Sequence, residues 1–315
     1  MNNRHLLRFL PTGVLFACGG AAFAATAPVA PLTKGASIYA CHHSYFVAVP
    51  PILTELAKAG GFPDQTILGD HMIGGSKSIQ HWESHDAEMN KGRGELTAGK
   101  VDVLILTPVY LPDDGIEKFA QLGFEHNPDI RVTVMEAWAP FDVYNPRLYD
   151  SHYQPQPGEP PMMPRPAKVD HNAATGEGMR KMMEYYVRTM NEHIIALNKK
   201  MGKQVIFVVP MTEAVVSLRE KIIAGKAPGL KVQEDLFSDE LGHPKPPLAV
   251  LEAYCHYAVI YRKSPVGLPV PAALTKAGIP AEYLGALNRL LQELAWDAVV
   301  NHPLSGVASK QANAG

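Results

Sequence analysis

The chain has 315 residues, of which 46% are hydrophobic and 19% are charged, and its formal net charge is −2 at pH 7. This composition is typical of a globular protein with a large core, and it excludes an intrinsically disordered chain. The near-neutral charge gives no electrostatic basis for binding nucleic acid or an anionic membrane surface.

Residues 1–24 are predicted to be a signal peptide. Arg4 and Arg8 precede an apolar stretch, and Ala22-Phe23-Ala24 has the small-x-small form of a cleavage site. A lipoprotein signal is the alternative, in which Cys18 becomes a lipid-anchored N-terminus. No later run is long and apolar enough to span a bilayer. Both the signal peptide and the lipoprotein signal predict an exported protein, periplasmic or secreted.

Two cysteines, Cys41 and Cys255, follow the signal segment. Exported proteins can keep disulfides, so one alternative is a Cys41–Cys255 pair. The other is that both are small, buried, apolar side chains, which is the usual behaviour of a free cysteine.

Strand-like and helix-like segments alternate along the chain. Strands are predicted over 37–40, 65–68, 101–106, 130–137 and 204–209, with a short one over 231–236. Helices are predicted over 47–59, 78–90, 115–122, 177–200, 213–224, 248–261 and 281–299. Strands separated by helices imply right-handed crossovers and a parallel sheet. The predicted fold class is therefore α/β: a three-layer α/β/α sandwich of flavodoxin-like type with about five parallel strands.

The domain organisation predicted is a single α/β domain over residues 25–300, followed by a loose tail over 301–315. Seven prolines between Pro146 and Pro166 interrupt the alternation and define an insertion over 141–176. A proline-rich segment of this length is either a binding loop or lid, or a surface excursion without a role.

A candidate nucleophile, Ser44, follows the first predicted strand, where a parallel sheet delivers side chains to its crevice. A serine hydroxyl needs a base, and the base needs an acid to orient it. His243 supplies the base, with Glu240 or Asp239 as the acid. The order serine, acid, histidine is that of α/β hydrolases, although the Gly-x-Ser-x-Gly elbow is absent. The plainer alternative is a turn serine and a helix-capping histidine.

These residues resemble the SGNH hydrolase superfamily, also called GDSL-like esterases. Ser44 corresponds to its first block, and Gly74 or Gly75 to the glycine of its second block. The segment from Glu240 to His243 has the acid-x-x-His spacing of its fifth block, with Glu in place of Asp. Two departures are the His42-His43 pair before the serine and the missing third-block Asn, where Thr107 stands instead.

The resemblance implies an ester-hydrolysing site that needs no cofactor. In that scheme Ser44 attacks the carbonyl, His243 relays the proton, and Glu240 or Asp239 orients the imidazole. The backbone amides of Ser44 and Gly75, with Thr107, would stabilise the oxyanion. The expected substrate is a small-molecule or saccharide ester. The alternative function is a non-catalytic periplasmic binding protein for a saccharide or a metal on the same fold.

The metal alternative depends on His42, His43, His81 and His85. His81 and His85 are four residues apart on a predicted helix and would share one face. Such a pair, with His42 or His43 as a further ligand, suits a divalent ion. The competing interpretation is that these histidines line a polar pocket.

Overall fold

The computed structural model describes residues 30–138, 171–239 and 241–307. The predicted signal peptide, Cys18, and residues 139–170 of the proline-rich stretch lie outside these ranges, as does Glu240. Near the end of the predicted insertion, His171–Ala173 form a short 3₁₀ helix, η3. None of the described helices is long and apolar enough to cross a membrane.

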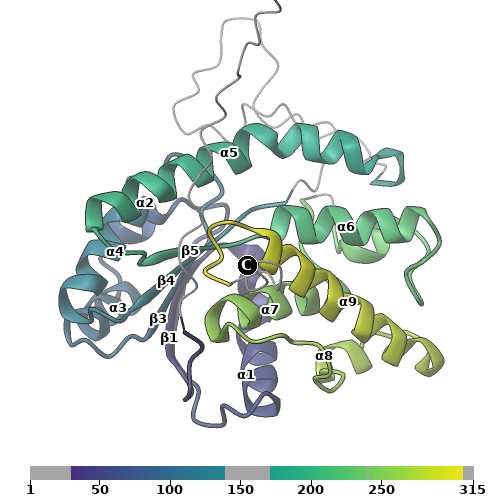
Figure 1. Cartoon of the computed structure of the whole chain (residues 1–315), viewed down its shortest axis with the longest axis horizontal. Coiled ribbons are helices and arrows are strands. Elements are labelled where there is room, and N and C mark those ends of the chain that lie inside the picture. The colour runs from purple at the N-terminus through teal and green to yellow at the C-terminus, as the bar shows by residue number, and fades with distance from the viewer. Residues whose placement is uncertain (1–29, 139–170, 240, 308–315) are drawn as a thin grey trace, which may run out of the picture.

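Five parallel strands form one sheet in the order β2-β1-β3-β4-β5 (Figure 1). They are β1 (Ser37–His42), β2 (Thr66–Met72), β3 (Val103–Leu106), β4 (Arg131–Met135) and β5 (Ile206–Val209). Along the chain, β2 is placed on one side of β1, and β3, β4 and β5 follow on its other side. The strand order therefore reverses between β1 and β3. In sheets of this kind ligands bind in the crevice outside the carboxyl ends of the strands at that reversal.

Helices cover both faces of the sheet (Figure 1). They are α1 (Val49–Ala59), α2 (Ser78–Glu83), α3 (Ala87–Thr97), α4 (Asp114–His126), α5 (Gly176–Met201), α6 (Met211–Ile223), α7 (Pro246–Tyr261), α8 (Ala272–Thr275) and α9 (Ala281–Asn301). Two further 3₁₀ helices are η1 (Ser44–Ala48) and η4 (Gln233–Leu236).

The side chains of β1 divide between two hydrophobic cores. Ile38 and Ala40 belong to a core shared with α1, α6, α7 and α9. Tyr39 and Cys41 belong to a second core, shared with α3, α4 and α5. Because successive side chains of a strand point to opposite faces, the two cores lie on opposite sides of the sheet. The predicted three-layer α/β/α fold is confirmed.

The disulfide alternative is wrong. Cys41 and Cys255 are both free and buried. Cys41 lies in the core on the α3 face, whereas Cys255 of α7 lies in the core on the opposite face. The sheet separates them, and each acts as a small apolar side chain.

Three local predictions are also wrong. The helix expected over 78–90 is two helices, because the Asp86 carboxylate accepts a hydrogen bond from the Met89 amide and begins α3. The strand expected over 231–236 is η4, since the Asp235 carboxylate accepts from the amides of Lys231 and Val232. The tail is not loose over 302–307, where the buried Leu304 accepts a backbone hydrogen bond from Val208.

Glu136, which follows β4, is a buried carboxyl group whose contribution to the free energy of unfolding changes with pH. Burial raises its pKa from 4.5 to about 7, against hydrogen bonds from Thr212 that lower it. A pKa that is higher in the folded chain means that the group favours folding below about pH 4.5 and loses that contribution as the pH rises through 7.

We therefore expect Glu136→Gln to be more stable than the unaltered protein at pH 8, by about 3 kcal/mol, and nearly equal to it at pH 4.5. A glutamine keeps an acceptor for the Thr212 amide, which donates to Glu136 over 3.2 Å. Urea unfolding at several pH values measures the difference, with the exposed Glu125→Gln as the control. A stability gap that does not change with pH would contradict this account.

Candidate active site

Three side chains form a hydrogen-bonded line at the carboxyl end of β1. His243 Nε2 lies 2.8 Å from Ser44 Oγ, and His243 Nδ1 lies 2.6 Å from Asp239 Oδ2. A carboxylate can only accept, so the Nδ1–H of His243 donates to Asp239 and Nε2 accepts the hydroxyl of Ser44. This is the tautomer that a general base beside a serine nucleophile requires.

The acid and the histidine meet because the chain folds back between η4 and α7. Phe237 and Pro244 form an antiparallel bridge, and Gly242 has a φ of +80°, a conformation that favours glycine. Asp239 Oδ1 accepts from the amides of Leu241 at 3.0 Å and His243 at 3.2 Å. One carboxylate oxygen therefore holds the turn, and the other is left for the imidazole.

These contacts also set the charge of Asp239. Partial burial raises its pKa, but the hydrogen bonds from the His243 ring and amide outweigh burial and leave the pKa below its ordinary value. The carboxyl group is thus ionised at neutral pH. The side chains of His243 and Asp239 are 28% and 45% exposed, so a ligand in solution can reach the pair.

The serine turn is fixed by its two histidine neighbours. His43 is the N-cap of η1, and its Nδ1 accepts from the Tyr45 amide over 3.3 Å. Burial, with the nearby histidines, lowers the pKa of His43 to about 3, so the ring is neutral. His42 Nε2 lies 3.0 Å from Asp70 Oδ2 on β2. Both histidines are engaged beneath the turn, with their side chains buried.

An aromatic pair joins the serine turn to the histidine loop. Tyr45 stacks on Trp138, with ring centroids 4.3 Å apart. Tyr45 Oη donates to the carbonyl oxygen of Leu241 over 2.5 Å, and Trp138 Nε1 donates to that of Gly242 over 3.2 Å. Aromatic stacking adds to the apolar burial, so the loop that carries His243 is held against the neighbour of Ser44.

The backbone segment that follows β2 is bonded to the end of β1, two residues before Ser44. Ile73, after β2, donates its amide to the carbonyl of His42 over 3.0 Å, and Gly74 and Gly75 follow it. Gly75 has a φ of +59°, and neither glycine has an atom within 4 Å of the place a Cβ would occupy. Among the described residues, neither glycine amide donates a hydrogen bond. Both are available to a ligand.

Thr107, expected as an oxyanion donor, contacts the backbone just before the serine. Its side chain is buried, and its Oγ1 accepts a hydrogen bond from the His43 amide over 2.9 Å. Thr107 therefore anchors the backbone one residue before Ser44.

The histidines do not form a metal site in the described part of the chain, where no group of three or more His, Cys, Asp or Glu residues could hold an ion. The predicted shared helix face is wrong: α2 ends at Glu83, and His85 is exposed in the turn beyond it. His81 instead lies between Ser76 and His71, a role that its spacing does not predict. The preference of Asp for the helix N-cap, here at Asp86, is the sequence signal for the break between α2 and α3.

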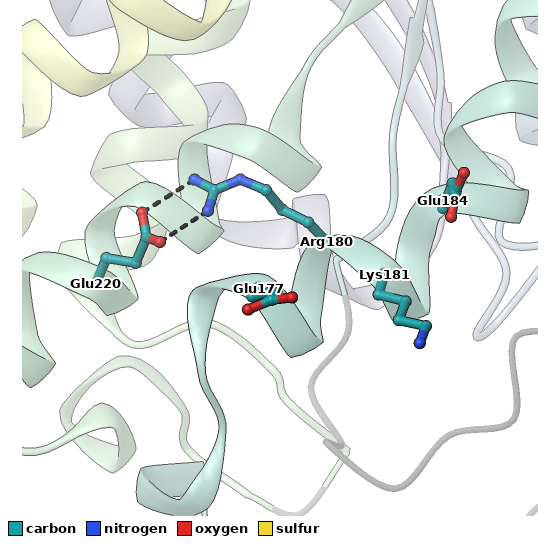
Figure 2. Close-up of a pocket in the computed structure, with 5 residues that line it drawn as sticks. All are labelled: Glu177, Arg180, Lys181, Glu184 and Glu220. Carbon is teal, nitrogen blue, oxygen red and sulfur yellow. Dashed lines mark hydrogen bonds and ion pairs between the residues drawn. The ribbon is translucent and has the colours of Figure 1, made fainter.

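A concave surface elsewhere on the molecule lies between α5 and α6 and is lined by charged side chains (Figure 2). Arg180 extends from α5 to α6, where its two Nη atoms donate to Glu220 over 2.7 and 2.9 Å. It also pairs with Glu213 over 2.7 Å. Arg180 is thus paired with two carboxylates, and none of the residues that line this surface is a serine, cysteine or histidine. The Ser44 site remains the candidate for chemistry.

No protein-family model matches the chain, and no curated protein matches it. Among solved structures, a DUF4886 family protein from Bacteroides uniformis aligns with a TM-score of 0.49 and 12% sequence identity. The alignment covers 89% of this chain and 98% of that one.

Proposed function

We propose that this protein is a serine hydrolase of the SGNH type that cleaves ester bonds. The observation that carries the proposal is the continuous hydrogen-bonded line from Ser44 through His243 to Asp239. An exposed carboxylate, a half-exposed imidazole and a hydroxyl in this order are the components that activate a serine nucleophile.

In the first half of the reaction, Ser44 Oγ attacks the ester carbonyl carbon while its proton moves to His243 Nε2. Asp239 stabilises the resulting imidazolium through its short contact with Nδ1. His243 then gives this proton to the leaving alcohol oxygen as the bond from carbon to that oxygen breaks. The acyl group is left as an ester on Ser44.

In the second half, water attacks the acyl-serine, and His243 takes a proton from that water. The proton returns to Ser44 Oγ as the acyl bond breaks, and the carboxylic acid leaves. The developing oxyanion requires donors in both halves. Since the Thr107 side chain is buried and its oxygen anchors the His43 amide, we assign this role to the backbone amides of Ser44 and Gly75.

The substrate proposed is a small-molecule or saccharide ester, and the reaction needs no cofactor. The signal-like N-terminus supports an exported protein, in the periplasm or outside the cell, with a lipid anchor at Cys18 as the alternative form.

The test is covalent labelling of the purified protein with a fluorophosphonate probe, followed by peptide mass spectrometry. We expect one adduct on Ser44, lost in Ser44→Ala and reduced at least a thousandfold in rate in His243→Ala. Ser217→Ala on α6 is the control and keeps the adduct. A folded protein without an adduct on Ser44 would overturn the proposal.

A further inference from the structure

A second serine, Ser76, ends a longer hydrogen-bonded chain next to the candidate site. Its Oγ lies 2.8 Å from His81 Nε2, and His81 Nδ1 lies 2.9 Å from His71 Nδ1. His71 Nε2 lies 2.7 Å from Asp86 Oδ2. Ser76, His81 and His71 are buried, with exposed fractions of 1%, 1% and 6%. Ser76 is therefore closed to substrate, and the chain is internal as far as Asp86, whose side chain is 46% exposed.

The direction of this chain follows from its acidic end. The Met89 amide and the Ser84 hydroxyl donate to Asp86 and lower the pKa of its carboxyl group, which can only accept. His71 must then donate from Nε2 and accept at Nδ1, and His81 donates from Nδ1. His81 Nε2 is left to accept the Ser76 hydroxyl. Burial lowers the pKa of His81 to about 3, which keeps its ring neutral.

The chain ends on the loop that carries the candidate oxyanion donors. Ser76 follows Gly75 directly, and its carbonyl oxygen accepts from the Val109 amide over 3.0 Å. On the other side, the loop is joined to β1 by the bond from Ile73 to His42. Between these two anchors Gly74 and Gly75 have no side chains, and nothing lies within 4 Å of the places where their Cβ atoms would be. No side-chain packing therefore holds these two residues, and the two anchors hold the ends of their loop.

We propose that the chain Ser76–His81–His71–Asp86 fixes the Gly74–Gly75 loop beside Ser44, and that Ser76, His81 and His71 are positioning residues for ester hydrolysis. The inference rests on the proposed function. A hydrogen-bonded network whose inner members are buried and satisfied, as Ser76, His81 and His71 are, selects one arrangement. Oxyanion donors act only when they are held close to the productive geometry. The network thus supplies the rigidity that two glycines lack.

The first arm of the test determines the histidine tautomers of this hydrogen-bonded chain by NMR, a measurement that does not depend on activity. In ¹⁵N-labelled protein we expect opposite tautomers: His81 protonated at Nδ1 and His71 at Nε2. In Asp86→Asn, the side-chain oxygen stays with the Met89 amide at the 2.8 Å contact, so the amide nitrogen faces His71. Both histidines should then reverse their tautomers. Unchanged tautomers in this variant would show that the hydrogen-bonded chain from Asp86 to Ser76 does not exist as described.

The second arm measures the loop through Ser44. In Ser76→Ala we expect the rate of fluorophosphonate labelling, and kcat for a nitrophenyl ester, to fall about tenfold with KM unchanged. His85→Gln, at an exposed histidine in the same region, is the control and keeps the rate. If Ser76→Ala reacts as fast as the unaltered protein, the positioning role is wrong and the hydrolase proposal stands. If the unaltered protein is not labelled at Ser44, the hydrolase proposal fails and this inference falls with it.

Discussion

Asp239→Asn is expected to lower kcat for ester hydrolysis by about a thousandfold or more. The reason lies in the two oxygens of this carboxylate. Oδ1 accepts from the amides of Leu241 and His243, so the asparagine must keep its oxygen there. Its amide nitrogen then replaces Oδ2, 2.6 Å from His243 Nδ1. Two donors cannot face each other, so the imidazole moves its proton to Nε2 and can no longer accept one from Ser44.

Glu240→Gln is the matched control, because the sequence alone does not distinguish the two neighbouring acids. Asp239 already occupies His243 Nδ1, so we expect the Glu240 variant to keep kcat within about twofold. Steady-state hydrolysis of a nitrophenyl ester measures kcat for the Asp239→Asn and Glu240→Gln variants. Loss of activity in Glu240→Gln with retention in Asp239→Asn would reverse the assignment of the acid.

Asp113→Ala is expected to lower the free energy of unfolding by about 3 kcal/mol. This buried carboxylate accepts from the amides of Ser78 and Ile79 at the start of α2, and from Gly115 at the start of α4. Burial raises its pKa, against these three amide hydrogen bonds, which lower it. The alanine variant leaves donors at the N-termini of both helices without an acceptor.

Urea unfolding, monitored by circular dichroism, measures the free energy of unfolding of the Asp113→Ala variant. Asp114→Ala is the control, because Asp114 is the neighbouring, exposed first residue of α4 and contributes only a fraction of a kcal/mol there. Equal losses in the two variants would show that Asp113 contributes only through the helix dipole.

Much of the fold could be predicted from the chain because its signals are local. The buried strands β3, β4 and β5 are short apolar runs, and the helices between them have apolar faces at helical spacing. The errors came where a polar side chain bonds to its own backbone. Asp86 divides one predicted helix, and Asp235 turns a predicted strand into η4. Such competition depends on a few ångströms of geometry that periodicity does not encode.

The pairing of Ser44 with His243 could be predicted for a chemical reason: a serine nucleophile needs a base, and the order serine, acid, histidine is that of α/β hydrolases. The identity of the acid could not, because it depends on the left-handed turn at Gly242. The stack of Tyr45 on Trp138 was also beyond the sequence, since the two rings come from separate strands' ends and no spacing rule relates them. The same holds for the Ser76 chain, which joins β2, α2 and the turn before α3.

The aromatic stack has a consequence for how reactivity arises in this chain. Ser44 and His243 are 199 positions apart, and they meet only when the loop before α7 rests on Tyr45 and Trp138. Contacts between such distant positions carry a large cost in chain entropy and form with the fold as a whole. A nascent or unfolded chain therefore has an ordinary, inert alcohol at position 44. Under the proposed function, the nucleophilic character of Ser44 Oγ is therefore a property of the whole folded chain.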